Sequence, residues 1–109
     1  MARDRGLEDL VEAELQTTAG LSRKAMFGGW AWLRYGNLLC GARVDSLLVR
    51  LGKGQDGWAL AIDGIVPMVS GGRTMPGWVR ASADAYGDEE LLRRLIAAAV
   101  AFNGTLPPQ

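Results

Sequence analysis

A nearly continuous apolar stretch, KAMFGGWAWLRYGNLLCGA, occupies residues 24–42. Side chains alternate along a strand, so Met26, Trp30 and Trp32 are expected to share one face, and the residues between them the other. Both sets are apolar, and strands of this kind are typical of sheets covered on both faces. Any fold for this chain must therefore shield both sides of its sheet.

Capping and turn residues divide the rest of the chain into short elements. We expect helices over residues 4–18, 55–62 and 88–102, with Asp4 and Asp88 as N-caps. We expect strands over residues 25–33, 38–43, 47–51, 65–69 and 78–82, with a loop over residues 70–77. Pro67 cannot donate a ladder hydrogen bond, so its strand should lie at an edge or carry a bulge.

The order α-β-β-β-α-β-β-α predicts an α+β fold with two layers. The sheet should be mainly antiparallel and five-stranded, with the helices on one face. In the first helix the spacing of Leu7, Leu10, Val11 and Leu15 predicts one apolar stripe. No linker interrupts the pattern, so we expect residues 1–109 to form a single domain.

Composition narrows the function classes. Twelve basic and twelve acidic residues cancel, so the whole molecule has no general attraction for nucleic acid or an anionic membrane. Neither a signal peptide nor a membrane span is indicated, and we expect a cytoplasmic protein. Histidine is absent and Cys40 is the one cysteine, which argues against imidazole catalysis and a zinc site. We expect a non-enzymatic protein without cofactor or metal, with Cys40 as a small buried apolar residue.

The second face of the sheet prompts a hypothesis about partners. Three short helices can cover one face, so the other is expected to meet a second copy of the chain, through the face itself or a strand edge. Met26, Trp30 and Trp32 are the residues expected to form or border this contact. Another protein could take the same place. The alternative is that the twist of a small sheet and long arginine stems hide this surface.

Two rival functions stay open. Arginines beside the tryptophans could stack on bases, which would make the chain a nucleic-acid-binding regulator, although its zero net charge argues against this. The second rival is an enzyme or small-molecule binder that works through residues 70–77, where Arg73 could complete an anion nest, or through the tryptophan-lined face.

Short motifs also occur in one order along the chain. They comprise Met26, Phe27, Gly28 and Gly29; Gly36 and Asn37; Cys40 and Gly41; Arg50 and Gly52; Pro67 and Met68; and Gly72, Arg73, Met75, Gly77, Trp78 and Val79. A closing helix and the sequence LPP follow. This set resembles the N-terminal domain of the TfoX (Sxy) family.

The resemblance implies a two-layer α+β fold of the secretion-chaperone-like kind. It also implies a link to regulation of natural competence, in which full-length members act with a transcriptional activator. It supplies no catalytic residue. Family members often carry an acidic residue and an aromatic one where this chain has Val69 and Ser70. No C-terminal TfoX domain follows within the 109 residues, so we expect a stand-alone copy of the N-terminal domain.

Overall fold

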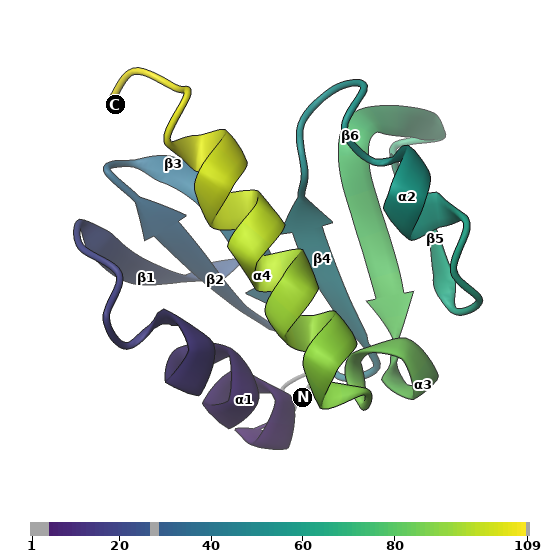
Figure 1. The fold of residues 1–109 in the computed structure, drawn as a ribbon, viewed down its shortest axis with the longest axis horizontal. Helices are drawn as coiled ribbons and strands as arrows, with labels where there is room; N and C mark the ends of the chain where they lie inside the picture. Colours follow the sequence, from purple (N-terminus) through teal and green to yellow (C-terminus); the bar gives the residue numbers. More distant parts are fainter. Residues whose placement is uncertain (1–4, 27–28, 109) are drawn as a thin grey trace.

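The computed structural model describes residues 5–26 and 29–108. Its elements are α1 (Arg5–Leu15), β1 (Leu21–Met26), β2 (Gly29–Arg34), β3 (Asn37–Ala42), β4 (Ser46–Arg50), α2 (Gly57–Leu60), β5 (Ile65–Ser70), β6 (Arg73–Ser82), α3 (Ala83–Tyr86) and α4 (Glu89–Asn103). The strands form one antiparallel sheet in the order β1-β2-β3-β4-β6-β5. Figure 1 shows the helices on one side of it. The predicted two-layer α+β fold is confirmed.

The sheet has six strands where five were predicted. Residues 25–33, predicted as one strand, belong to a hairpin in which β1 ends at Met26 and β2 begins at Gly29. The sequence is apolar from Ala25 to Leu33, so the periodicity gave no sign that two strands are present. Phe27 and Gly28 lie outside the described residues, as does the predicted cap Asp4. Gly29 is needed for close packing, because a side chain there would overlap the carbonyl oxygen of Ala42.

The predicted loop over residues 70–77 is also strand. β5 ends at Ser70 and β6 begins at Arg73, and the two glycines between them have φ values of +59° and +78°. Such a pair fits a tight two-residue hairpin turn. Pro67 behaves as predicted, since β5 is an edge strand and its register shifts beside this proline. At the shift, four residues of β6 (75–78) stand opposite Met68 alone.

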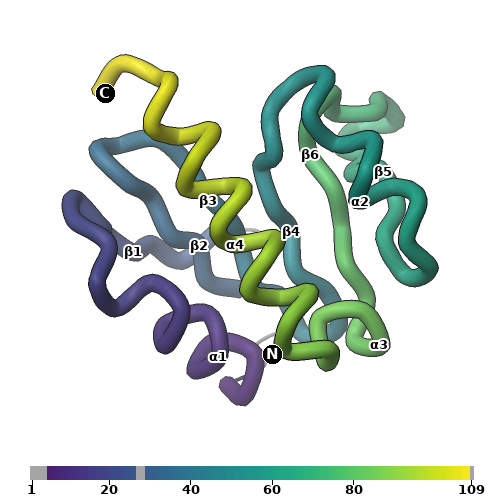
Figure 2. Tube along the Cα trace, in the orientation of Figure 1, coloured from purple at the N-terminus to yellow at the C-terminus, as the bar shows by residue number. Residues whose placement is uncertain are grey.

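Helix α4 runs diagonally across the sheet, between α1 and the segment that joins β4 to α2 (Figure 2). The predicted N-cap is confirmed, because the Asp88 carboxylate accepts hydrogen bonds from the N–H groups of Glu90 and Leu91, at 3.1 and 3.2 Å. In α1, Leu7, Val11 and Leu15 are buried in the core. Leu10 is not part of that stripe. Its side chain is 41% exposed, because residues four apart already fill the contact with the sheet.

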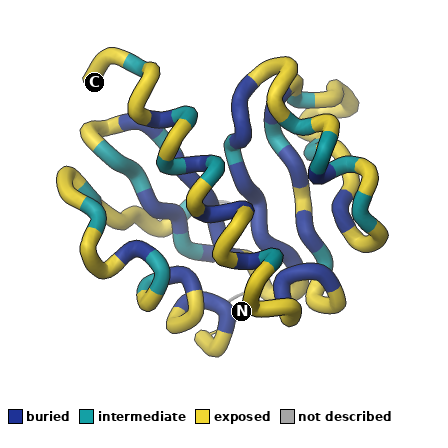
Figure 3. Tube along the Cα trace, in the orientation of Figure 1, coloured by how far each residue is buried: buried dark blue, intermediate teal, exposed yellow. Residues whose placement is uncertain are grey.

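Both faces of the central strands are buried within the single chain. Trp32 belongs to the core cluster beneath the helices, and Trp30 packs against that cluster. On the opposite face Ala31 and Leu48 are 0% and 1% exposed, in one row with Gly41. Figure 3 shows β4 buried along its length and β1 largely exposed. The middle of the second face is thus buried within the chain, although the described helices lie on the other face.

Candidate binding groove

The three predicted contact residues lie in different environments. Trp32 is 0% exposed, and its Nε1–H donates a 2.8 Å hydrogen bond to the Glu12 carboxylate of α1. Trp30 is half-buried against the core, and Met26 is half-buried at the end of β1. The two tryptophans share a face, as predicted, but it is the face that the helices cover. Trp32 could reach a partner only if α1 moved away.

The Glu12 side chain connects α1 to the hairpin formed by β1 and β2. Besides the Trp32 indole, its carboxylate accepts a 2.7 Å hydrogen bond from the Arg23 guanidinium of β1. Partial burial acts to raise the pKa of Glu12, but the hydrogen bonds from Arg23 and Trp32, together with the charge of Arg23, outweigh it. The net result is a pKa below the ordinary value, so Glu12 is ionised at neutral pH. This flank of α4 is closed by the chain itself.

On the other flank of α4, two of the sequence motifs meet. The Gly77 carbonyl oxygen accepts hydrogen bonds from the N–H groups of Leu51 (2.8 Å) and Gly52 (3.1 Å). A side chain at Gly77, where φ is +83°, would overlap the backbone of Gly52 and Lys53. The widened segment of β6 therefore holds the end of β4 at a fixed distance, and the chain leaves the sheet here toward α2.

Arg50 links this junction to α4. Its guanidinium carbon lies 5.3 Å from the ring centroid of Phe102 and 5.9 Å from that of Trp78. Nearby, buried Asn103 donates from Nδ2 to the carbonyl oxygens of Arg34 and Asn37, at 3.3 and 3.4 Å. These contacts fix the C-terminal end of α4 over the sheet.

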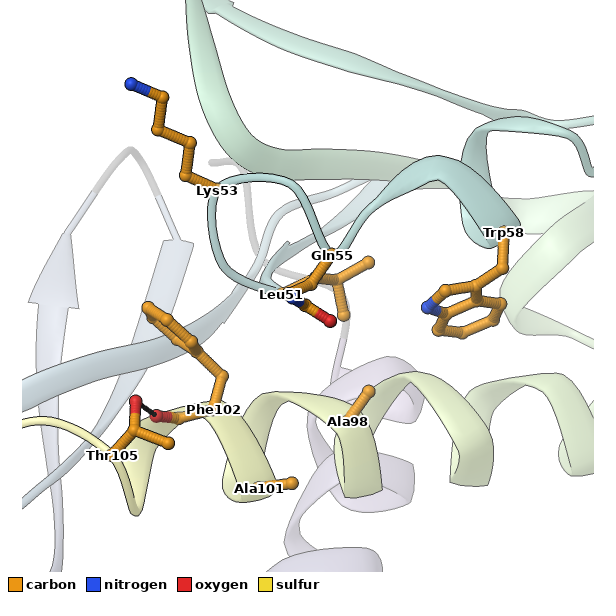
Figure 4. Close-up of a pocket in the computed structure, with 8 residues that line it drawn as sticks. All are labelled: Leu51, Lys53, Gln55, Trp58, Ala98, Ala101, Phe102 and Thr105. Carbon is orange, nitrogen blue, oxygen red and sulfur yellow. Dashed lines mark hydrogen bonds between the residues drawn. The ribbon is translucent and has the colours of Figure 1, made fainter.

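A groove of about 510 Å³ opens between residues 51–58 and the C-terminal half of α4. Its apolar lining consists of Leu51, Trp58, Ala98, Ala101 and Phe102. Its polar lining consists of Lys53, Gln55 and Thr105. In Figure 4 the rings of Trp58 and Phe102 stand apart with the Gln55 amide between them, and Lys53 points outward. The alanine side chains on α4 are short, so α4 forms the floor of the groove and the aromatic rings form its walls.

The polar groups around this groove favour an anionic or acceptor-bearing ligand. Lys53 is the one charged lining residue, and the Arg94 guanidinium carbon lies 4.1 Å from the Trp58 ring centroid. The Trp58 indole N–H makes no hydrogen bond to any described residue. An indole N–H that becomes buried usually finds an acceptor, so a ligand that covers Trp58 should supply one.

The other sequence hypotheses fall outside this groove. Burial raises the pKa of the Cys40 thiol to about 12, which agrees with the predicted structural cysteine. Arg73 lies exposed at the tip of the β5–β6 hairpin. Residues 5–26 and 29–108 contain no group of three or more potential metal-ligating side chains. Among the same residues, no helix has the length and apolarity needed to span a membrane.

Sequence reasoning missed the groove as a site. It assigned Trp58 to the least regular helix and treated residues 88–102 as a covering helix, without bringing them together. One available signal was Trp58 itself, a large apolar residue at the end of a segment (51–58) with three glycines and with Gln55 and Asp56 beside it, where no strand or long helix could bury it.

A family model described as TfoX N-terminal domain matches residues 13–103 of this 109-residue chain. The match includes the motifs at the β4–β6 junction and most of the groove lining. The curated proteins and the solved structures give no significant match.

Proposed function

The chain belongs to the TfoX N-terminal domain family, and we propose that it is a non-enzymatic regulatory domain that works by binding protein. The regulatory part of this proposal rests on membership of the family, which implies a link to the regulation of natural competence. The binding part rests on the groove between residues 51–58 and α4. The proposal allows either a second copy of the chain or a different protein as the partner.

The groove is the observation that carries the proposal. Its volume of about 510 Å³ is within the range of ligand sites, and aromatic and small apolar side chains form most of its lining. Protein interfaces commonly use aromatic anchors of this kind, surrounded by a polar rim. Among its lining residues, one lysine is the only group that titrates, so an acid–base pair for catalysis is not supported there.

The groove replaces the tryptophan face as the proposed contact surface. Trp32 is buried beneath α1, and the centre of the open sheet face is buried too. By contrast, Trp58 and Phe102 are half-buried and border accessible space. A partner can therefore reach the groove without unfolding any part of the chain.

A blocked groove provides the test. Ala101→Glu places a longer, acidic side chain in the groove while keeping a good helix former on α4. Ala83→Glu makes the same exchange at an exposed position on α3, away from the groove, and serves as the matched control. Tagged wild-type, Ala101→Glu and Ala83→Glu proteins are used to capture proteins from host extract and an untagged second copy. Each captured protein is then purified and titrated by calorimetry.

We expect the wild-type and Ala83→Glu proteins to bind the same purified partner, and Ala101→Glu to bind it at least about tenfold more weakly. Equal binding by all three would remove the groove from the proposal. A mobility-shift titration with DNA and RNA runs in parallel. Binding of nucleic acid that survives moderate salt and is lost in Ala101→Glu would replace protein by nucleic acid as the partner.

A further inference from the structure

The outer surface of α1 has the opposite character to the groove. Leu10 is its one large exposed apolar residue, at 41%, with exposed Asp9 and Ala13 beside it. The Asp9 carboxylate makes no ion pair with any described residue, in contrast with Glu12 and Glu14, which pair with Arg23 and Arg93. The surface thus offers a leucine anchor next to an unpaired negative charge.

The groove offers the complement. Lys53 makes no ion pair with any described residue. It stands beside a space lined by two aromatic rings and two alanines. An aliphatic side chain fits such a space, and a carboxylate at its edge would neutralise the lysine. Leu10 with Asp9 matches the groove with Lys53 in size, polarity and charge.

The elements that carry these two surfaces, α1 and the segment that joins β4 to α2, lie on opposite sides of α4 (Figures 1 and 2). Helix α1 lies beside the N-terminal half of α4, and the groove lies beside its C-terminal half. A two-fold axis that crosses the outer surface of α4 obliquely, near its middle, would therefore turn α1 of one copy over the groove of the other. The same rotation places the second α1 over the first groove, so the contact occurs twice and the assembly closes as a dimer. Exposed Ala97 and Ala101 would allow the two α4 helices to approach closely.

From this arrangement we infer that two copies pair through their helix layers, with α1 of each copy lying in the groove of the other. Leu10 occupies the space between Trp58 and Phe102, and the Asp9 carboxylate faces the Lys53 ammonium. This inference rests on the proposed function, because it requires the groove to bind protein, and it names the occupant as α1 of a second copy.

Molar mass from light scattering over a range of concentrations tests the pairing. The single chain has a mass of 11.7 kDa, so the wild-type protein should approach twice that value as concentration rises. Leu10→Gln removes the anchor from both contacts and should raise the dimer dissociation constant by about a hundredfold. Val69→Gln is the control, because Val69 is 61% exposed on the edge strand β5, and it should leave the constant unchanged.

A charge exchange separates this contact from a general loss of apolar surface. Asp9→Lys and Lys53→Asp each place like charges in both contacts, and each should weaken pairing about tenfold. The double variant restores opposite charges with their positions reversed, and pairing should return to near the wild-type level. Because Asp9 belongs to α1 and Lys53 to the segment between β4 and α2, and these lie on opposite sides of α4, an effect within one chain would not produce this rescue.

A wild-type protein that remains a monomer at every concentration would overturn the inference. A dimer that dissociates in Val69→Gln but not in Leu10→Gln would do so as well, in favour of a strand-edge contact. Failure here and failure of the proposed function are distinguishable. A monomer whose groove still binds a purified partner, with Ala101→Glu deficient, keeps the proposed function and rejects only the second copy as its occupant.

Discussion

Trp32 and Trp58 lie on the two flanks of α4, Trp32 on β2 and Trp58 on α2, and they differ in what covers them. Trp32 lies beneath α1, is fully buried and donates its indole N–H to Glu12. Trp58 is half-buried in the groove, and its N–H has no acceptor among the described residues. Helix α1 therefore covers the first flank, and no other helix among the described residues covers the second flank in this way. By analogy with α1, an apolar side chain and a carboxylate would complete the open flank.

The largest effect is expected from the closed flank. Trp32→Ala leaves a cavity beneath α1 and removes the hydrogen bond to Glu12, so it should lower the free energy of unfolding by about 4 kcal/mol. A domain of this size has a stability of roughly 5–15 kcal/mol, and the variant should be marginally folded. Urea denaturation followed by circular dichroism measures the change.

Trp32→Phe keeps most of the apolar volume and should cost about half as much. If Trp32→Ala loses less than about 1 kcal/mol, α1 does not close this flank, and the contrast with the groove disappears.

Two glycine variants test whether the β4–β6 junction beside the groove is tightly packed. Gly77→Ala should lower the free energy of unfolding by about 3 kcal/mol, because the methyl group would overlap the Gly52 backbone at a positive φ. Gly54 also has a positive φ, +82°, but no atom lies within 4 Å of an added Cβ. Gly54→Ala should therefore cost only the conformational strain, about 1 kcal/mol. Equal losses in the two variants would show that the β4–β6 junction is not tightly packed.

Short-range sequence features predicted much of the α4 helix and the sheet that the two flanks share. Asp88 caps α4 because its carboxylate accepts hydrogen bonds from the N–H groups two and three residues later, and Pro67 marks its own strand as an edge strand with a register shift. Both effects act over a few residues and can be read in one sequence. The division between β1 and β2 was missed because the sequence is apolar on both faces, so alternation does not mark the end of a strand.

The groove could not be predicted in the same way. Residues 51–58 and α4 meet only because Gly77 holds the end of β4 and Arg50 contacts Phe102. These contacts join residues that are 25 to 52 positions apart in the sequence. The position of Leu10 is a similar case. Its spacing fits the apolar stripe of α1, and only the orientation of the helix on the sheet decides that this leucine faces outward.

The third prediction concerns the charge that closes the first flank. The pKa of Glu12 is lowered in the folded chain, so its stabilisation is complete above the ordinary glutamate value of about 4.3 and is lost as pH falls through the folded value. Glu12→Gln should lower the free energy of unfolding at pH 7 by roughly 1 kcal/mol, since the Glu12 side chain is 34% exposed and water screens the pair.

The difference between wild type and Glu12→Gln should shrink steadily below about pH 4. Glu89→Gln is the control, because Glu89 pairs with Arg93 across 3.7 Å on the surface and is 76% exposed. It should change stability by less than about 0.3 kcal/mol at any pH. A Glu12→Gln effect that stays constant from neutral to acid pH would mean that packing, and not the carboxylate charge, holds α1.

The smallest effect on stability is expected at Trp58, and it tests the comparison most directly. Trp58→Leu removes a half-buried ring and its contact with Arg94, so the free energy of unfolding should fall by less than about 1 kcal/mol. Acrylamide quenching should show that the variant has lost an accessible component of the fluorescence, while the emission of buried Trp32 is protected in both proteins. Pairing of the chain should weaken at the same time, because the groove has lost one aromatic wall. A variant that is as destabilised as Trp32→Ala would show that the two flanks are equally closed, and that Trp58 belongs to the core and not to a binding surface.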